Sequence, residues 1–190
     1  MDAIELLTTR TSTGAFAEPG PDDVQLATIF RAAMKAPDHG RIRPWRFIVI
    51  RGDARHAFAD VMVQAMKRRD PTATEPLLEK EREKPLRAPV IVAVATQIQK
   101  DHPKIPAVEQ LLAAGSAAHN IMLAANALGF GAAWKTGDVA YDTSVKKALG
   151  LTSEDQIIGF MYLGSKKPEA PRPSPPDAAK FVTEWTGPVT

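Results

Sequence analysis

The residue types best suited to chemistry gather in two stretches that lie far apart in this chain. The first is Arg10-Thr11-Ser12, a guanidinium and two hydroxyls directly after a short helical segment. Arginine offers a rigid fork of N–H donors that matches phosphate oxygens, so this stretch predicts a phosphate-binding loop. The alternative is that Arg10 caps the helix or pairs with a carboxylate. Lys35 and Lys135 could add positive charge for the same anion, although each taken singly is expected in solvent.

The second stretch, residues 36–47, joins a helix to an apolar strand. Its nitrogen-bearing side chains stand beside Trp45, and they are His39, Arg41, Arg43 and Arg46. Such a set suits a polar, planar ligand. The alternative for His39 is a hydrogen-bonded loop residue without a ligand, and Trp45 is expected to pack in the core.

Several catalytic and cofactor classes lack their sequence signatures. The chain has no cysteine, which excludes disulfides and Cys-ligated metals, and none of its four histidines stands at metal-ligand spacing from another. We therefore expect no metal. Gly129-Phe130-Gly131 follows a helix instead of a strand, so it is not a dinucleotide fingerprint. No nucleophile elbow, catalytic triad order or His-Glu-x-x-His motif occurs. We therefore expect no catalytic side chain, since a bound cofactor can itself carry the chemistry of a reaction.

Composition places the chain among ordinary globular proteins. Its 190 residues are 44% apolar and 24% charged, so we expect one domain over residues 1–190. The net charge of +2 is too small to predict a nucleic-acid partner, although the pI near 8.9 keeps that class as a distant alternative. No early apolar run is long enough for a signal peptide or a membrane span, so we expect a cytoplasmic protein.

Hydrophobic periodicity predicts helices that alternate with short strands. The helices are expected at 2–8, 22–36, 54–69, 75–84, 107–128 and 142–149, and the strands at 47–50, 88–96, 132–136 and 157–164. Together with roughly one further strand, they give an α+β sandwich. The helix at 107–128 is apolar almost all round, which is typical of a buried helix.

The last part of the chain, residues 165–190, is rich in proline before an apolar pentad. The prolines are Pro168, Pro171, Pro173, Pro175 and Pro176, and the pentad is Phe181–Trp185. Proline-rich spacers are extended and do not pack as a core. The pentad therefore needs a docking surface, either on this subunit or on another.

Motifs along nearly the whole chain resemble those of the nitroreductase family, in its short branch. They are residues 1–7, Arg10-x-Ser12, Ala36-Pro37-Asp38-His39, Pro44-Trp45, Arg87-Ala88-Pro89, Gly129-Phe130-Gly131-x-x-Trp134-x-x-Gly137, Gly159-Phe160-x-Tyr162-Leu163-Gly164 and Phe181-Val182. The resemblance implies a dimer-forming sandwich in which helices flank a central, mostly antiparallel sheet. It also implies a homodimer that holds FMN between its subunits, with residues 165–190 packed on the partner.

The resemblance assigns roles to particular residues. The FMN phosphate and ribityl chain would contact Arg10, Thr11 and Ser12, the other subunit would supply Lys35 and His39, and the flavin would lie along Trp134, Lys135 and Thr136. A pyridine-nucleotide role falls on Ala124, Ala125, Asn126, Ala127, Leu128 and Gly129. The chain departs from the branch at Thr11, Lys35 and Lys135, where arginine is common, and lysine keeps the charge without the bidentate fork.

The resulting prediction is an FMN-dependent NAD(P)H oxidoreductase. It would reduce nitroaromatic compounds, quinones or similar acceptors by ping-pong hydride transfer. The alternatives are a flavin enzyme of the same fold with another reaction, such as dehalogenation or flavin breakdown, and a flavin-binding protein without catalysis.

Overall fold

The structure of the chain is a computed structural model, and it describes residues 2–168 and 176–188. Along the chain the elements are α1 (Ala3–Thr9), β1 (Phe16–Ala17), α2 (Asp23–Ala33), η1 (His39–Arg41), β2 (Trp45–Arg51), α3 (Ala54–Arg69), α4 (Glu75–Glu83), η2 (Lys84–Arg87), β3 (Val90–Thr96), α5 (Ala107–Ala127), β4 (Gly131–Lys135), η3 (Asp138–Ala140), α6 (Thr143–Ala148), β5 (Gln156–Lys166) and η4 (Ala178–Lys180).

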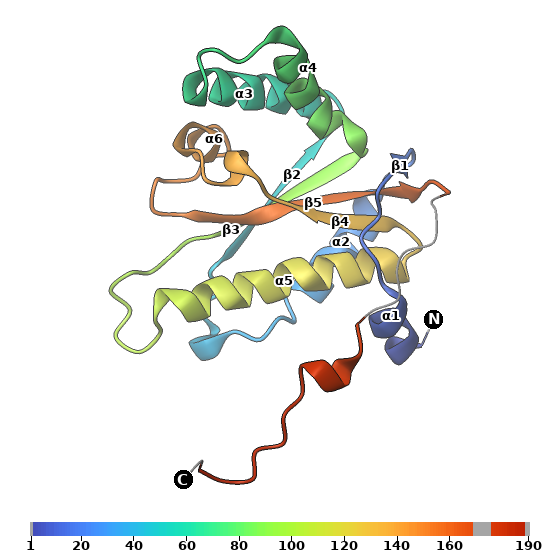
Figure 1. Cartoon of the computed structure of the whole chain (residues 1–190), viewed down its shortest axis with the longest axis vertical. Coiled ribbons are helices and arrows are strands. Elements are labelled where there is room, and N and C mark those ends of the chain that lie inside the picture. The colour runs from blue at the N-terminus through green and yellow to red at the C-terminus, as the bar shows by residue number, and fades with distance from the viewer. Residues whose placement is uncertain (1, 169–175, 189–190) are drawn as a thin grey trace.

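The five strands form one sheet in which every neighbouring pair is antiparallel. The order is β1-β5-β3-β2, and β4 also pairs with β5. The long β5 is the centre of the sheet, since it pairs with β3 along one edge, with β4 along the other, and with β1 at its C-terminal end. Helices flank this sheet (Figure 1), so the expected α+β class is confirmed.

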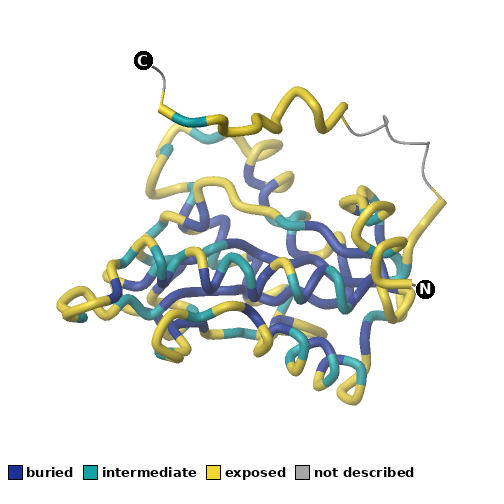
Figure 2. The backbone as a smooth tube through the Cα atoms, turned by 90° about the horizontal axis from the view of Figure 1, so that it is seen from below, coloured by how far each residue is buried: buried dark blue, intermediate teal, exposed yellow. Residues whose placement is uncertain are grey.

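Helices cover both faces of the sheet, and β3 shows how the sequence achieves this. Val90, Val92 and Val94 pack in the cluster with α2 and α5, whereas the alternate residues Ile91 and Ala93 pack in the cluster with α3. A strand covered on both faces reads as a continuous apolar run, which is why β3 has no polar alternation. Buried residues accordingly concentrate in the middle of the molecule (Figure 2).

The helix α5 is buried on one face only. Ala114, Ala118 and Ile121 are fully buried against the sheet and α2. Val108 and Leu112, in contrast, are 58% and 65% exposed. The prediction of a helix buried all round is therefore wrong for a single copy of the chain, because no element described here covers the outer face.

Some boundaries differ from those that the sequence predicts. The helix α2 ends at Ala33 instead of Ala36, and β4 ends at Lys135, which leaves Thr136 in the following loop. The short β1 has no periodic pattern of its own, since its two residues are strand only through pairing with Ser165 and Lys166 of β5.

Of the tail, the structure describes residues 165–168 and 176–188. Phe181 and Trp185 are 75% and 79% exposed, so none of the described residues covers the apolar pentad. Pro171, Pro173 and Pro175 lie outside the described residues. Packing of the tail on a partner subunit stays a prediction.

Candidate functional site

The predicted phosphate-binding loop is fixed at both of its ends by backbone hydrogen bonds. The N–H of Arg10 donates to the carbonyl of Leu6 at 3.1 Å and ends α1. The N–H of Thr13 donates to the carbonyl of Ala132 in β4 at 2.9 Å. The second bond holds the loop against β4, so two parts of the predicted site that are distant in sequence are neighbours in space.

The side chain of Arg10 has a buried donor without a partner. Its Nη1 is inaccessible to solvent and makes no hydrogen bond within the part of the chain that the structure describes. A guanidinium keeps its charge in proteins, and a buried donor without an acceptor destabilises a fold by about 1–3 kcal/mol. Thr11 and Ser12 follow it and are exposed. The loop therefore offers a guanidinium fork and two hydroxyls to an anion, which fits a phosphate ester.

The three predicted residues at the end of β4 all border one cavity, but the side chain of Trp134 is anchored elsewhere. Its indole Nε1 donates to the carbonyl of Ile158 at 3.1 Å. The ring lies on Gly159, where a Cβ would come within 2.7 Å of the indole Cδ1. Lys135 and Thr136 are exposed. A ligand along β4 would thus meet these two residues, while Trp134 holds the strand in place.

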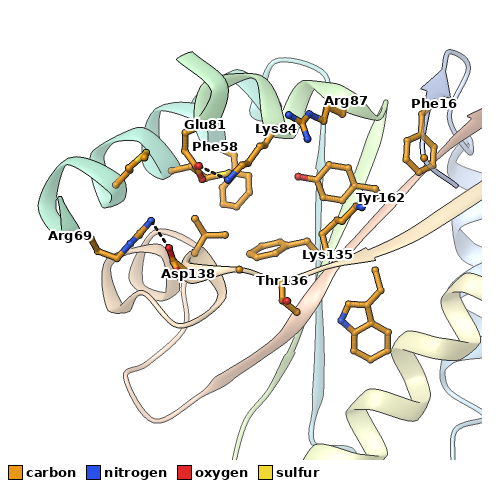
Figure 3. Close-up of a pocket in the computed structure, with 17 residues that line it drawn as sticks. Phe16, Phe58, Arg69, Glu81, Lys84, Arg87, Lys135, Thr136, Asp138 and Tyr162 are labelled. Carbon is orange, nitrogen blue, oxygen red and sulfur yellow. Dashed lines mark hydrogen bonds and ion pairs between the residues drawn. The ribbon is translucent and has the colours of Figure 1, made fainter. Parts of the chain in front are cut away.

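The cavity lies between the sheet and the pair α3–α4, and its volume is about 600 Å³ (Figure 3). Small-molecule and cofactor sites commonly have this size. The chain that leaves the phosphate-binding loop enters its wall at Gly14. Its apolar lining consists of Phe16, Phe58, Met62, Met66, Val139 and Phe160.

Charged groups converge on the same cavity from several elements. Lys84 and Arg87 come from η2, Lys135 from β4 and Glu81 from α4 (Figure 3). The carboxylate of Glu81 forms an ion pair with the ammonium of Lys84. The other end of the cavity is closed by Arg69, whose Nη2 lies 3.8 Å from the Oδ2 of Asp138.

Tyr162 brings a hydroxyl to the cavity wall (Figure 3). The residue is only 6% exposed. Burial raises the pKa of Tyr162 to about 12, while the charge of Arg87 lowers it and the charge of Glu81 raises it. The hydroxyl therefore keeps its proton at neutral pH and can donate a hydrogen bond to a ligand.

His39 lies far from the phosphate-binding loop of its own chain. Its Nδ1 is 2.5 Å from the Oε2 of Glu109, near the start of α5, whereas that loop contacts Ala132, beyond the other end of α5. The 18 residues between Glu109 and Ala127 span about 27 Å of helix. Lys35 is exposed and does not line the cavity. One copy of the chain therefore does not bring His39 together with Arg10.

The segment predicted to contact NAD(P)H is the last turn of α5 and the two residues after it. Ala125 and Asn126 are buried, and the amide of Asn126 donates to the carbonyl of Met122 at 2.9 Å. Ala127, Leu128 and Gly129 are exposed. The free groups at a helix C-terminus are carbonyls, which suit a backbone or apolar contact better than a phosphate. A nucleotide role here stays a prediction.

Sequence reasoning missed the charged wall of the cavity. The run Glu79–Lys84 has the composition of a solvated helix face, and only its packing on α3 shows that Glu81 is buried. One available signal was the alternation along β5, which puts Phe160 and Tyr162 on one face. Within residues 2–168 and 176–188 no three His, Cys, Asp or Glu side chains gather at a metal-binding distance. In the same ranges no helix is long and apolar enough to cross a membrane.

Comparison with known proteins identifies relatives along the whole fold. The sequence model of the Nitroreductase family matches residues 7–165. The chain is 39% identical over 184 residues to the protein named "Putative NAD(P)H nitroreductase YdjA" of Escherichia coli K12, covering 96% of this chain and 99% of that one.

Solved structures share the fold at lower sequence identity. A nitroreductase-like family protein from Bacillus cereus superposes with a TM-score of 0.83 at 19% identity, over 98% of this chain and 97% of that one. The FMN and NADPH-dependent nitroreductase NfnB from sphigopyxis sp. strain HMH gives a TM-score of 0.78 at 20% identity, over 98% and 100%.

Proposed function

The chain belongs to the nitroreductase family, a family of oxidoreductases, and we propose that it is an FMN-dependent NAD(P)H oxidoreductase of the cytoplasm. Its acceptors would be nitroaromatic compounds, quinones or similar molecules. The observation that carries this proposal is the buried, unpartnered Nη1 of Arg10 on a loop that leads into the cavity. When bound, FMN would take two electrons and a proton from NAD(P)H and pass them to the acceptor.

In this proposal the phosphate of FMN binds at Arg10, Thr11 and Ser12. From Arg10 the extended chain reaches Gly14, at the cavity, within about 14 Å. That reach suits a ligand with its phosphate at the loop and its ring system beside Lys135 and Thr136. The sequence has no dinucleotide-binding fingerprint that would hold an adenosine half, so FMN is favoured over FAD.

A second copy of the chain would complete the site. His39 cannot reach the Arg10 loop within one subunit, so we propose that His39 and Lys35 act in the site of the partner. The exposed apolar side chains of α5 and α1 supply an interface for such a homodimer, and they are Val108, Leu112, Ile4 and Leu7. Obligate interfaces resemble a core cut in half, which fits this exposed apolar surface.

The tail would add to the same dimer. Phe181, Val182 and Trp185 are exposed, and the strand β2 is paired along one edge only within the described chain. An open strand edge can accept an extended segment of another chain. We propose that the apolar pentad packs on the partner. Removal of residues 169–190, which keeps β5 and its pairing with β1, should give monomer or soluble aggregate in light scattering instead of a dimer.

Two measurements test the proposed function. The chromophore released by heat should run with FMN on chromatography, and release of FAD, or failure of the protein to take up flavin, would contradict the cofactor assignment. Under anaerobic conditions NADH or NADPH should bleach the bound flavin, and the acceptor should restore its colour. Parallel double-reciprocal lines would then identify ping-pong turnover. A flavin that neither nucleotide bleaches would leave only a binding role.

A further inference from the structure

The wall of the cavity contains a buried carboxylate that the proposed site does not use. Glu81, in the last turn of α4, is only 5% exposed. Carboxylates this deeply buried are stable as anions only when a cation or several donors accompany them. The ammonium of Lys84, three residues further on, is the partner here.

The charges around Glu81 do not balance. Arg69 is accompanied by Asp138 and by Asp142, whose Oδ2 lies 3.2 Å from its Nη1. The three other cations of the cavity are Lys84, Arg87 and Lys135. Against them stands the single carboxylate of Glu81, because no ion pair is formed by Arg87 or Lys135 in the described chain. Lys84, Arg87, Lys135 and Glu81 together therefore give this part of the cavity wall two more positive charges than negative ones.

The charges of Glu81 and Arg87 act on the same group at the cavity wall, the hydroxyl of Tyr162. They act on it with opposite sign. In Figure 3 Arg87, Lys135 and Tyr162 lie at one end of the cavity and Arg69 and Asp138 at the other, while Lys84 extends between them to Glu81. A ligand that gains negative charge there is stabilised by the cations and destabilised by Glu81.

We propose that Glu81 is the counter-charge of this cavity, which limits how strongly Lys84, Arg87 and Lys135 favour the reduced form of a bound flavin over the oxidised form. The proposal rests on the proposed function. Two electrons and one proton convert the neutral oxidised ring into a reduced ring with one negative charge at neutral pH. Nearby cations therefore favour reduction, and a nearby carboxylate opposes it. Glu81 acts through the field and through its hold on Lys84, so it is a positioning residue.

This assignment predicts opposite effects of two isosteric changes. Glu81→Gln removes the negative charge and leaves the three cations unopposed, so reduced flavin should become more favoured. Lys84→Met removes a cation and exposes the charge of Glu81, so reduced flavin should become less favoured. The double variant should lie between the two. Glu79→Gln is the matched control, because Glu79 pairs with Arg82 on α4 and does not line the cavity.

The experiment is an anaerobic redox equilibrium of each FMN-loaded variant against a reference dye at pH 7. At a fixed dye ratio, the ratio of reduced to oxidised flavin should rise about tenfold for Glu81→Gln and fall about tenfold for Lys84→Met, as expected for one unit charge at short range. For Glu79→Gln it should stay within about twofold. The affinity of the apo-protein for oxidised FMN, followed by fluorescence quenching, should change much less than the redox ratio.

The outcomes separate this assignment from the proposed function. If the wild-type chain does not bind FMN, the proposed function falls and the assignment falls with it. If the wild-type chain binds FMN, an unchanged or lowered ratio in Glu81→Gln overturns the assignment alone. If Glu81→Gln does not fold, Lys84→Met decides, since Lys84 is 41% exposed at its side chain. An unchanged or raised ratio in Lys84→Met then overturns the assignment.

Discussion

Replacement of Arg10 by alanine separates a ligand-binding role of this residue from a structural one. In the structure the backbone N–H of Arg10, not its side chain, ends α1. The side chain buries an Nη1 that has no acceptor in the described chain. Arg10→Ala therefore keeps the helix end and removes a buried donor that is unsatisfied without a ligand. The melting temperature of the apo-protein should stay the same or rise slightly.

The same change should weaken FMN strongly. A hydrogen bond to a charged group contributes about 1.5–3 kcal/mol, which corresponds to a loss of affinity of roughly ten- to more than a hundredfold. Arg10→Lys keeps the charge without the bidentate fork and should lie between the wild type and Arg10→Ala. Lys67→Ala, which changes an exposed lysine of α3 that does not line the cavity, controls for loss of charge alone.

Fluorescence titration of apo-protein with FMN gives the dissociation constants, and differential scanning fluorimetry gives the melting temperatures. The expected pattern is a large loss of affinity without a loss of apo stability. An apo-protein that melts several degrees lower and still binds FMN with wild-type affinity would show that Arg10 stabilises the fold. The proposal for the phosphate would then have lost its central observation.

Three further predictions follow from the packing. Gly159→Ala forces a Cβ into the indole of Trp134 and should destabilise the protein by about 1–3 kcal/mol in denaturant titration, whereas Gly115→Ala, whose Cβ would be 4.0 Å from the same indole, should be tolerated. Burial raises the pKa of Tyr162 to about 12. The stabilising contribution of the buried, protonated hydroxyl is therefore present below pH 10 and is lost as the pH rises towards 12. By pH 11 the free energy of unfolding of the wild type should have fallen by about 1–2 kcal/mol more than that of Tyr162→Phe. Equal losses would contradict the burial of the hydroxyl. Leu112→Glu on the exposed face of α5 should convert a dimer into monomers in light scattering, while the equally exposed Val24→Glu on α2 should not; a dimer that survives Leu112→Glu would place the interface elsewhere.

The sequence predicts most elements of this fold because local signals mark them. Asp22 and Gln25 form a reciprocal capping box at the start of α2, with bonds of 2.8 and 2.9 Å. Gly129, with φ of 89°, stands directly after the last turn of α5, where only a residue without Cβ adopts that angle easily. These signals depend on a few neighbouring residues, so they can be read without tertiary contacts.

The parts that the sequence does not predict all depend on partners distant in the chain. The two-residue β1 exists through β5. The hydrogen bond of the Trp134 indole to the carbonyl of Ile158 and its contact with Gly159 also join residues that are distant in sequence, and the prediction of Trp134 beside a flavin stays a prediction. Glu81 lies on the same helix face as Leu78, one turn apart, and both are buried. Helical spacing alone predicts that the two side chains share a face. The many charges of the run Glu79–Lys84, however, indicate a solvent-exposed helix, so the sequence does not predict that this face is buried.

The placement of the two predicted half-sites determines what kind of dimer can complete them. The loop that follows Arg10 is bonded to Ala132, just beyond the C-terminal end of α5, and His39 is held by Glu109 near the N-terminal end of that helix. We propose a two-fold axis that runs perpendicular to α5 through its exposed face, because such an axis pairs the two helices in opposite directions and uses the same surface on both copies. The His39 end of one subunit then lies beside the Arg10 end of the other, twice over. The exposed Leu112 and Val108, the distance between the half-sites and the one-sided burial of α5 would then all follow from this one proposed arrangement, in which neither subunit has a complete site alone.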